Sequence, residues 1–124
     1  MKGTMKFDLE ERLVKFSGTI SYLAESLPNT ITGKYLAGQL IRSGLSPALN
    51  YGEAQSAEST NDLIHKMKIA LKELRETFIA LKIIKRKQYQ KVLLLVDSNM
   101  RECNELICIF VKSIQTAENN RKKA

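Results

Sequence analysis

Polarity repeats with the period of an α-helix between Gln39 and Glu53, and this pattern constrains the fold more than any other feature of the chain. At about 100° per residue, one face of such a helix carries only hydrogen-bonding side chains. We call this face the polar stripe; it consists of Gln39, Arg42, Ser46, Asn50 and Glu53. Small and aliphatic residues gather on the opposite face, namely Ala37, Ile41, Gly44, Leu45, Ala48 and Gly52. The pattern predicts a helix that buries its small and aliphatic face.

The polar stripe has two interpretations. A solvated surface is the usual one for the polar face of an amphipathic helix. Its mixture of amide, hydroxyl, guanidinium and carboxylate groups favours the other, because these groups can satisfy one another inside an interface. If the next helix is antiparallel, Arg42 lies level with Leu74, and a charge-assisted hydrogen bond to Glu73 or Glu76 becomes possible. We therefore expect the stripe to be partly covered.

Four helical segments stand out along the chain, and no strand pattern competes with them. Apolar residues at helical spacing predict helices at about residues 8–27, 31–56, 59–87 and 90–118, with a distortion near Pro47 in the second. Three short links make neighbouring helices antiparallel, which predicts an all-α, up-down-up-down four-helix bundle. The bundle is expected to be one domain over residues 1–124, with a frayed polar tail at 119–124. The positions predicted to be buried are Leu13, Phe16, Ile20, Ile41, Ala48, Ala70, Leu74, Leu81, Cys103, Ile107 and Phe110.

The third predicted helix carries a second apolar row beside its core-facing one. This row consists of Ile64, Leu71 and Phe78. Left uncovered, it would form an apolar patch of a kind that soluble monomers seldom expose. The pattern therefore predicts a closed homo-oligomer, although it gives no number of subunits.

Length and composition are those of one soluble domain. The chain has 124 residues and a mass of 14.1 kDa, enough for a core without metals or disulfides. No apolar run resembles a signal peptide or reaches the length of a membrane span, so we expect a cytoplasmic protein with no membrane partner. Cys103 and Cys108 are placed for neither a local disulfide nor a metal pair, and we interpret both as small, at least half-buried hydrophobes.

No arrangement of residues indicates catalysis. His65 is the only histidine, so neither a catalytic triad nor a paired Glu-x-x-His metal site can form within one chain. The sequence lacks a glycine-rich phosphate loop, a nucleophile elbow and a zinc pattern. We therefore predict a non-enzyme with no catalytic residues, no bound metal and no cofactor.

Charge is the remaining functional signal. Twenty Lys and Arg against thirteen Asp and Glu give a net charge of +7. Much of the excess lies around the link between the third and fourth predicted helices, in Lys82, Lys85, Arg86, Lys87 and Lys91. These are candidate nucleic-acid-binding residues, because phosphate contacts add when several subunits present them together. The other interpretation is that cations at a helix C-terminus only favour the helix dipole and solubility.

Residues Gln39 to Glu76 resemble a known family. The run QLIRSGLSPALNYGE from Gln39 to Glu53, followed by KIALKELRE from Lys68 to Glu76, is similar to the four-helix-bundle proteins encoded in intervening sequences of bacterial large-subunit rRNA. The family's motif positions fall here on Gln39, Arg42, Ser46, Asn50, Glu53, Ala70 and Glu76. The chain departs from the motif at Ala54, where the family has glycine, and at Lys72-Glu73, where it has Gly-Ser.

This resemblance implies an antiparallel four-helix bundle that forms a ring-shaped homopentamer. One branch of the family resembles the accessory proteins of diversity-generating retroelements, which are thought to bind nucleic acid and a reverse transcriptase. It thus suggests a nucleic acid, or an enzyme acting on one, as a partner. The motif residues are candidates for an interface.

Two functional hypotheses follow from the sequence. The first is a non-enzymatic, oligomeric interaction or scaffold protein that binds RNA or DNA non-specifically through its basic surface. The second is a structural or regulatory protein-binding bundle with no nucleic-acid role. A salt titration of nucleic-acid binding separates them, because phosphate contacts make affinity depend steeply on salt.

Overall fold

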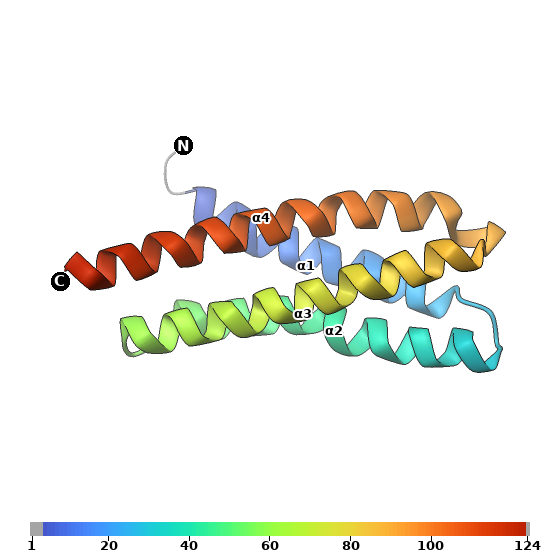
Figure 1. Cartoon of the computed structure of the whole chain (residues 1–124), viewed down its shortest axis with the longest axis horizontal. Coiled ribbons are helices and arrows are strands. Elements are labelled where there is room, and N and C mark those ends of the chain that lie inside the picture. Colours follow the sequence, from blue (N-terminus) through green and yellow to red (C-terminus); the bar gives the residue numbers. More distant parts are fainter. Residues whose placement is uncertain (1–3, 124) are drawn as a thin grey trace.

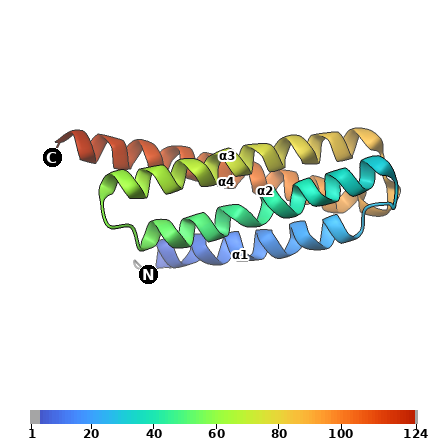
Figure 2. The same ribbon diagram turned by 90° about the horizontal axis from the view of Figure 1, so that it is seen from below.

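Four long antiparallel helices make up the fold of the computed structural model, which describes residues 4–123, with side chains from Leu9 onward (Figures 1 and 2). The helices are α1 (Thr4–Glu25), α2 (Ile31–Gln55), α3 (Thr60–Lys87) and α4 (Leu93–Lys123), and the short 3-10 helix η1 (Gln90–Val92) precedes α4. No strand occurs in residues 4–123. The α1–α2 and α3–α4 links lie at one end of the bundle, and the α2–α3 link lies at the other (Figure 1). The predicted up-down-up-down bundle is confirmed.

Local sequence sets most of the helix boundaries. The Thr30 side chain accepts a hydrogen bond from the Gly33 N–H at 3.0 Å, and the Ser59 side chain accepts one from the Asp62 N–H at 3.1 Å. Each cap satisfies one of the backbone donors that a helix N-terminus leaves free. The predicted starts of α2 and α3 are therefore confirmed to within one residue. Helix α2 also continues through Pro47 without a break.

Two predicted boundaries differ from the structure by several residues. Helix α1 begins at Thr4, a little before the predicted start near residue 8. Helix α4 continues to Lys123, so the tail expected to fray from residue 119 is helical through Lys123. Three basic residues in this last turn favour its continuation, because cations stabilise the negative end of a helix dipole.

The core is a continuous apolar cluster drawn from all four helices. Of the positions predicted to be buried, most are buried, and Ala48 and Ile107 are half-buried. Ile41 is the error, since 37% of it is exposed. The buried face of α2 is centred on Leu40, Pro47 and Tyr51, which lie beside the predicted face.

The second apolar row of α3 is largely covered within one chain. Ile64 is buried, and Leu71 and Phe78 are half-buried against the core. The expected patch at these three residues was therefore wrong. The large apolar residues that α3 exposes are instead Ile79 and Ile83.

Helix α2 packs extensively against both α1 and α3, and α4 packs extensively against α3, whereas α1 and α4 contact each other at far fewer places. The α1–α2 contact is close at Gly44. A Cβ atom added there would lie 2.5 Å from Ile20 Cγ2, and the β-branched Ile20 has little freedom to move away. Glycine at this position therefore lets the two helices approach.

We expect Gly44→Ala to lower the free energy of unfolding by up to about 2 kcal/mol, because overpacking against Ile20 costs about 1–3 kcal/mol and the gain in helix propensity returns about 1 kcal/mol. Gly38→Ala is the matched control. Its added Cβ meets nothing within 4 Å, so it should raise stability by up to about 1 kcal/mol. Urea denaturation followed by circular dichroism measures both. Equal stabilisation by the two variants would contradict the close α1–α2 contact.

The two free cysteines are expected to differ in reactivity. Cys103 is buried, its thiol donates to the Leu74 carbonyl at 3.3 Å, and burial raises its pKa to about 12. Cys108 is exposed, which corrects the expectation that it would be at least half-buried. Since the thiolate is the reactive form, a thiol reagent near pH 8 should modify one cysteine per native chain and two in denaturant. Rapid modification of both in the native protein would contradict the buried position of Cys103.

Candidate nucleic-acid and assembly surfaces

Five cations meet where α3 turns into η1, and we call them the basic corner. They are Lys82, Lys85, Arg86, Lys87 and Lys91. All five are exposed. Figure 1 places this turn at the same end of the bundle as the α1–α2 link. The structure thus brings together the residues that the sequence grouped as candidates.

The turn at Gln88 gives the basic corner its shape. Gln88 has a φ of 57°, in the left-handed region, and its backbone N–H donates to the Lys85 carbonyl at 3.1 Å. This conformation ends α3 and sends the chain back through Tyr89 into η1. The Lys87 ammonium lies 5.9 Å from the centre of the Tyr89 ring, within the range of a cation–π contact.

The basic corner is mostly unneutralised. Lys85 forms an ion pair with Asp97 of α4 at 3.0 Å, a contact that the local sequence did not indicate. The other four cations have no carboxylate within 4.0 Å among residues 9–123. An exposed pair such as Lys85–Asp97 contributes at most about 1 kcal/mol, so a polyanion can compete for that lysine. The corner therefore keeps the charge needed to attract phosphates.

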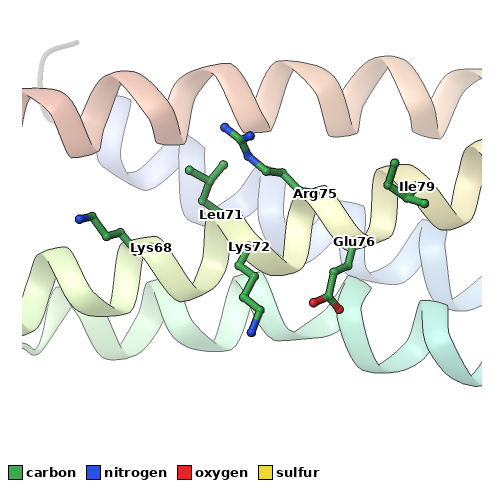
Figure 3. Close-up of a pocket in the computed structure, with 6 residues that line it drawn as sticks. All are labelled: Lys68, Leu71, Lys72, Arg75, Glu76 and Ile79. Carbon is green, nitrogen blue, oxygen red and sulfur yellow. The ribbon is translucent and has the colours of Figure 1, made fainter.

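The basic character continues along the outer face of α3. This helix carries eight Lys and Arg against three Asp and Glu. Figure 3 shows Arg75 and Ile79 pointing toward the α4 side of this helix, as Leu71 does, and Lys72 pointing toward the α2 side. A shallow hollow of about 410 Å³ lies among these side chains. Outside the basic corner, Lys72 and Arg75 also lack an ion-pair partner among residues 9–123.

Arg42 of the polar stripe bridges α2 to α3 as predicted. Its Nη1 donates to Glu73 Oε1 at 3.2 Å and its Nη2 to Glu76 Oε1 at 2.6 Å. The hydrogen bond that Arg42 donates to Glu76, with the charge of Glu73, raises the pKa of Arg42. With 55% of its side chain exposed, Arg42 contributes more to the register of the two helices than to stability.

The other residues of the polar stripe are partly covered. Asn50 Nδ2 donates to Ser46 Oγ at 2.8 Å, and Glu53 pairs with Lys66 of α3 at 2.6 Å. Gln39 is half-buried. Contacts within one chain therefore satisfy much of the stripe, and its use between subunits stays a prediction.

Sequence reasoning missed the polar contacts between α1 and α4. Arg12 donates to both carboxylate oxygens of Glu102, at 2.7 and 3.0 Å, and to Glu105 at 2.8 Å. These bonds, that to Glu102 above all, raise the pKa of Arg12. Thr19 Oγ1 donates a hydrogen bond to Oδ1 of the buried Asn99 at 2.8 Å, and both residues line a cleft together with Arg12 and Glu102. Partners 80 or more residues apart leave no local pattern that could have revealed these contacts.

The described part of the chain contains no group of three or more His, Cys, Asp and Glu residues placed to hold a metal ion. His65 is exposed on α3. None of the described helices combines the length and apolar character needed to cross a membrane.

Comparison with known proteins identifies the family. The family model described as "23S rRNA-intervening sequence protein" matches residues 6–112. Among solved structures, the chain is similar to a protein of unknown function from the S23 ribosomal protein family of Bacteroides thetaiotaomicron. That similarity has a TM-score of 0.76 at 29% identity and covers 86% of this chain and 97% of the other. No curated protein sequence matches. The chain therefore belongs to the 23S rRNA-intervening sequence protein family.

Proposed function

We propose that this protein is a non-enzymatic, cytoplasmic homo-oligomer that binds RNA or DNA without sequence preference through its basic corners. The observation that carries the proposal is the basic corner itself, with five exposed cations at one turn, of which one has a carboxylate partner among residues 9–123. Exposed Lys and Arg are the side chains that neutralise phosphates and release their counterions. Such a protein would act as a scaffold on nucleic acid or on an enzyme that acts on it.

Non-specific binding is favoured over sequence readout. Four of the five cations of the basic corner are lysines, which meet phosphates as flexible point charges, and the corner has one guanidinium. Tyr89 is the aromatic residue at the corner, and its half-buried ring lies against Lys87. One such ring is no stacking platform for bases.

Assembly into an oligomer would strengthen the attraction of the basic corners for nucleic acid. Among residues 9–123, nine large apolar side chains are exposed, six of them on α1 and α2, which supports burial against another subunit. The pentamer implied by the family resemblance would carry about +35 from five chains of +7, and it would present five basic corners together. Phosphate contacts from several corners add, so the oligomer would bind a nucleic acid more tightly than one corner alone.

We expect the affinity for a short RNA or DNA duplex to fall linearly with salt on logarithmic axes, by about 0.9 in slope per phosphate contacted on duplex DNA. The double variant Lys87→Ala/Lys91→Ala should weaken binding and flatten this slope, because it removes two unpaired cations from the corner. Lys15→Ala/Lys112→Ala is the matched control, since it removes the same charge from exposed sites on α1 and α4. Fluorescence anisotropy between about 50 and 200 mM salt measures all three proteins.

Two results would contradict the nucleic-acid proposal. One is the absence of salt-sensitive binding at about 50 mM salt by the wild-type protein. The other is an equal loss of binding in the corner and control variants, which would assign the effect to overall charge. Either result would favour the alternative, a structural or regulatory bundle that binds protein alone.

A further inference from the structure

The outer face of α3 carries an ordered pattern of charge and shape. Lys72 and Arg86 each lie seven residues from Ile79, about two helical turns, so the three side chains form one row. Ile79 is 54% exposed. Two shallow hollows flank it, one of about 410 Å³ on the side of Lys72 and one of about 340 Å³ on the side of Arg86. We call this surface the α3 row.

The outer face of α1 carries the complementary pattern, which we call the α1 row. Glu11 and Glu25 each lie seven residues from Gly18. Val14 and Tyr22 lie four residues on either side of Gly18, about one turn away, and they are 54% and 61% exposed. A Cβ atom added at Gly18 would meet nothing within 4 Å, so the helix surface between the two protruding side chains is open.

We propose that the α1 row of one copy docks on the α3 row of a second copy of this chain, with Ile79 seated over Gly18. Val14 and Tyr22 then enter the two hollows, and Glu11 and Glu25 pair with Lys72 and Arg86. This proposal rests on the oligomeric part of the proposed function and identifies the surfaces that form the contact.

Charge complementarity favours a second copy of this chain as the partner that covers the α3 row. Glu11, Glu25, Lys72 and Arg86 form no ion pair within the chain among residues 9–123. The α3 row is basic at both ends and apolar at its centre, whereas the α1 row is acidic at both ends with a glycine at its centre. A nucleic acid would satisfy the cations but leave Ile79 and the hollows without an apolar partner.

The two rows meet only between copies. Helices α1 and α3 each pack against α2 and α4, and their outer faces lie on different sides of the bundle. Since the two surfaces differ, the contact is heterologous, and it closes into a ring or continues as a fibre according to its rotation. The contact uses Arg86 and fills the hollow that Lys82 and Lys87 line, so Lys85 and Lys91 are the cations of the basic corner that stay outside it and can meet a polyanion.

Cysteine cross-linking tests the contact directly. In a Cys108→Ser background, the double variant Gly18→Cys/Ile79→Cys should form a ladder of disulfide-linked chains under mild oxidation. Each single variant should yield no species above a covalent dimer, because one cysteine cannot extend a chain. The control is Gly18→Cys/Leu94→Cys, in which the second cysteine replaces a side chain that is 86% exposed and outside the α3 row. It should give no ladder.

Charge reversal provides an independent measurement. Light scattering should show dissociation toward 14.1 kDa for Glu11→Lys/Glu25→Lys and also for Lys72→Glu/Arg86→Glu. Combining all four changes in one chain should restore the oligomer, because the charges are exchanged and the pairing is kept. Glu58→Lys, at an exposed site outside both rows, should leave the mass unchanged.

The outcomes separate this proposal from the function on which it rests. A wild-type oligomer that gives no ladder in the double variant, and keeps its mass after charge reversal, would overturn the pairing of these rows and leave the oligomeric function standing. A wild-type mass of 14.1 kDa would overturn both. Dissociation by each reversal with restoration by their combination would establish the pairing.

Discussion

The architecture depends on two small residues in the middle of α2. Ser43 is fully buried and is hydrogen-bonded through its hydroxyl to that of Thr77 on α3 at 2.8 Å, while Gly44 lies against Ile20 of α1. A larger side chain at either position would push a neighbouring helix away. Because α2 is held closely on both sides, its register against α3 is fixed, and Arg42 falls opposite Glu73 and Glu76. The close packing of α2 in the bundle and the position of Arg42 beside its glutamates therefore both depend on these two small residues.

The sequence predicted the number, order and direction of the helices because apolar periodicity and capping residues are local signals. The sequence did not predict correctly which face of α2 is buried. Neither Ser43 nor Pro47 was among the positions predicted to be buried, yet both are buried while Ile41 is exposed. Tertiary packing decided the face here: a hydroxyl can be buried when a second hydroxyl satisfies it, and no periodicity analysis contains that partner.

The candidate sites were predictable to the extent that their contacts followed from helix register. Antiparallel packing through a short link was enough to bring Arg42 to its glutamates. The Lys85–Asp97 pair and the contacts of Arg12 with α4 were not predictable, because they depend on how α4 lies against α3 and α1. The exposed apolar side chains of α3 were also assigned to the wrong residues, since Leu71 and Phe78 turn toward the core and Ile79 turns outward. The exposed Ile79 is therefore the apolar centre of the surface that we propose for assembly.

Together, the bundle offers an apolar and charged surface suited to another copy, and cations of the basic corner outside that surface that can meet a polyanion. Hydroxyl-radical footprinting of the wild-type protein tests this arrangement most directly, because it reads side-chain exposure in solution without a substitution. Tyr22 and Ile79 are 61% and 54% exposed in one chain, and Leu94 is 86% exposed outside both rows. We expect Tyr22 and Ile79 to be protected at working concentration and to become reactive on dilution, while Leu94 stays reactive throughout. Reactivity of Tyr22 and Ile79 that matches a single exposed chain at every concentration would contradict the account.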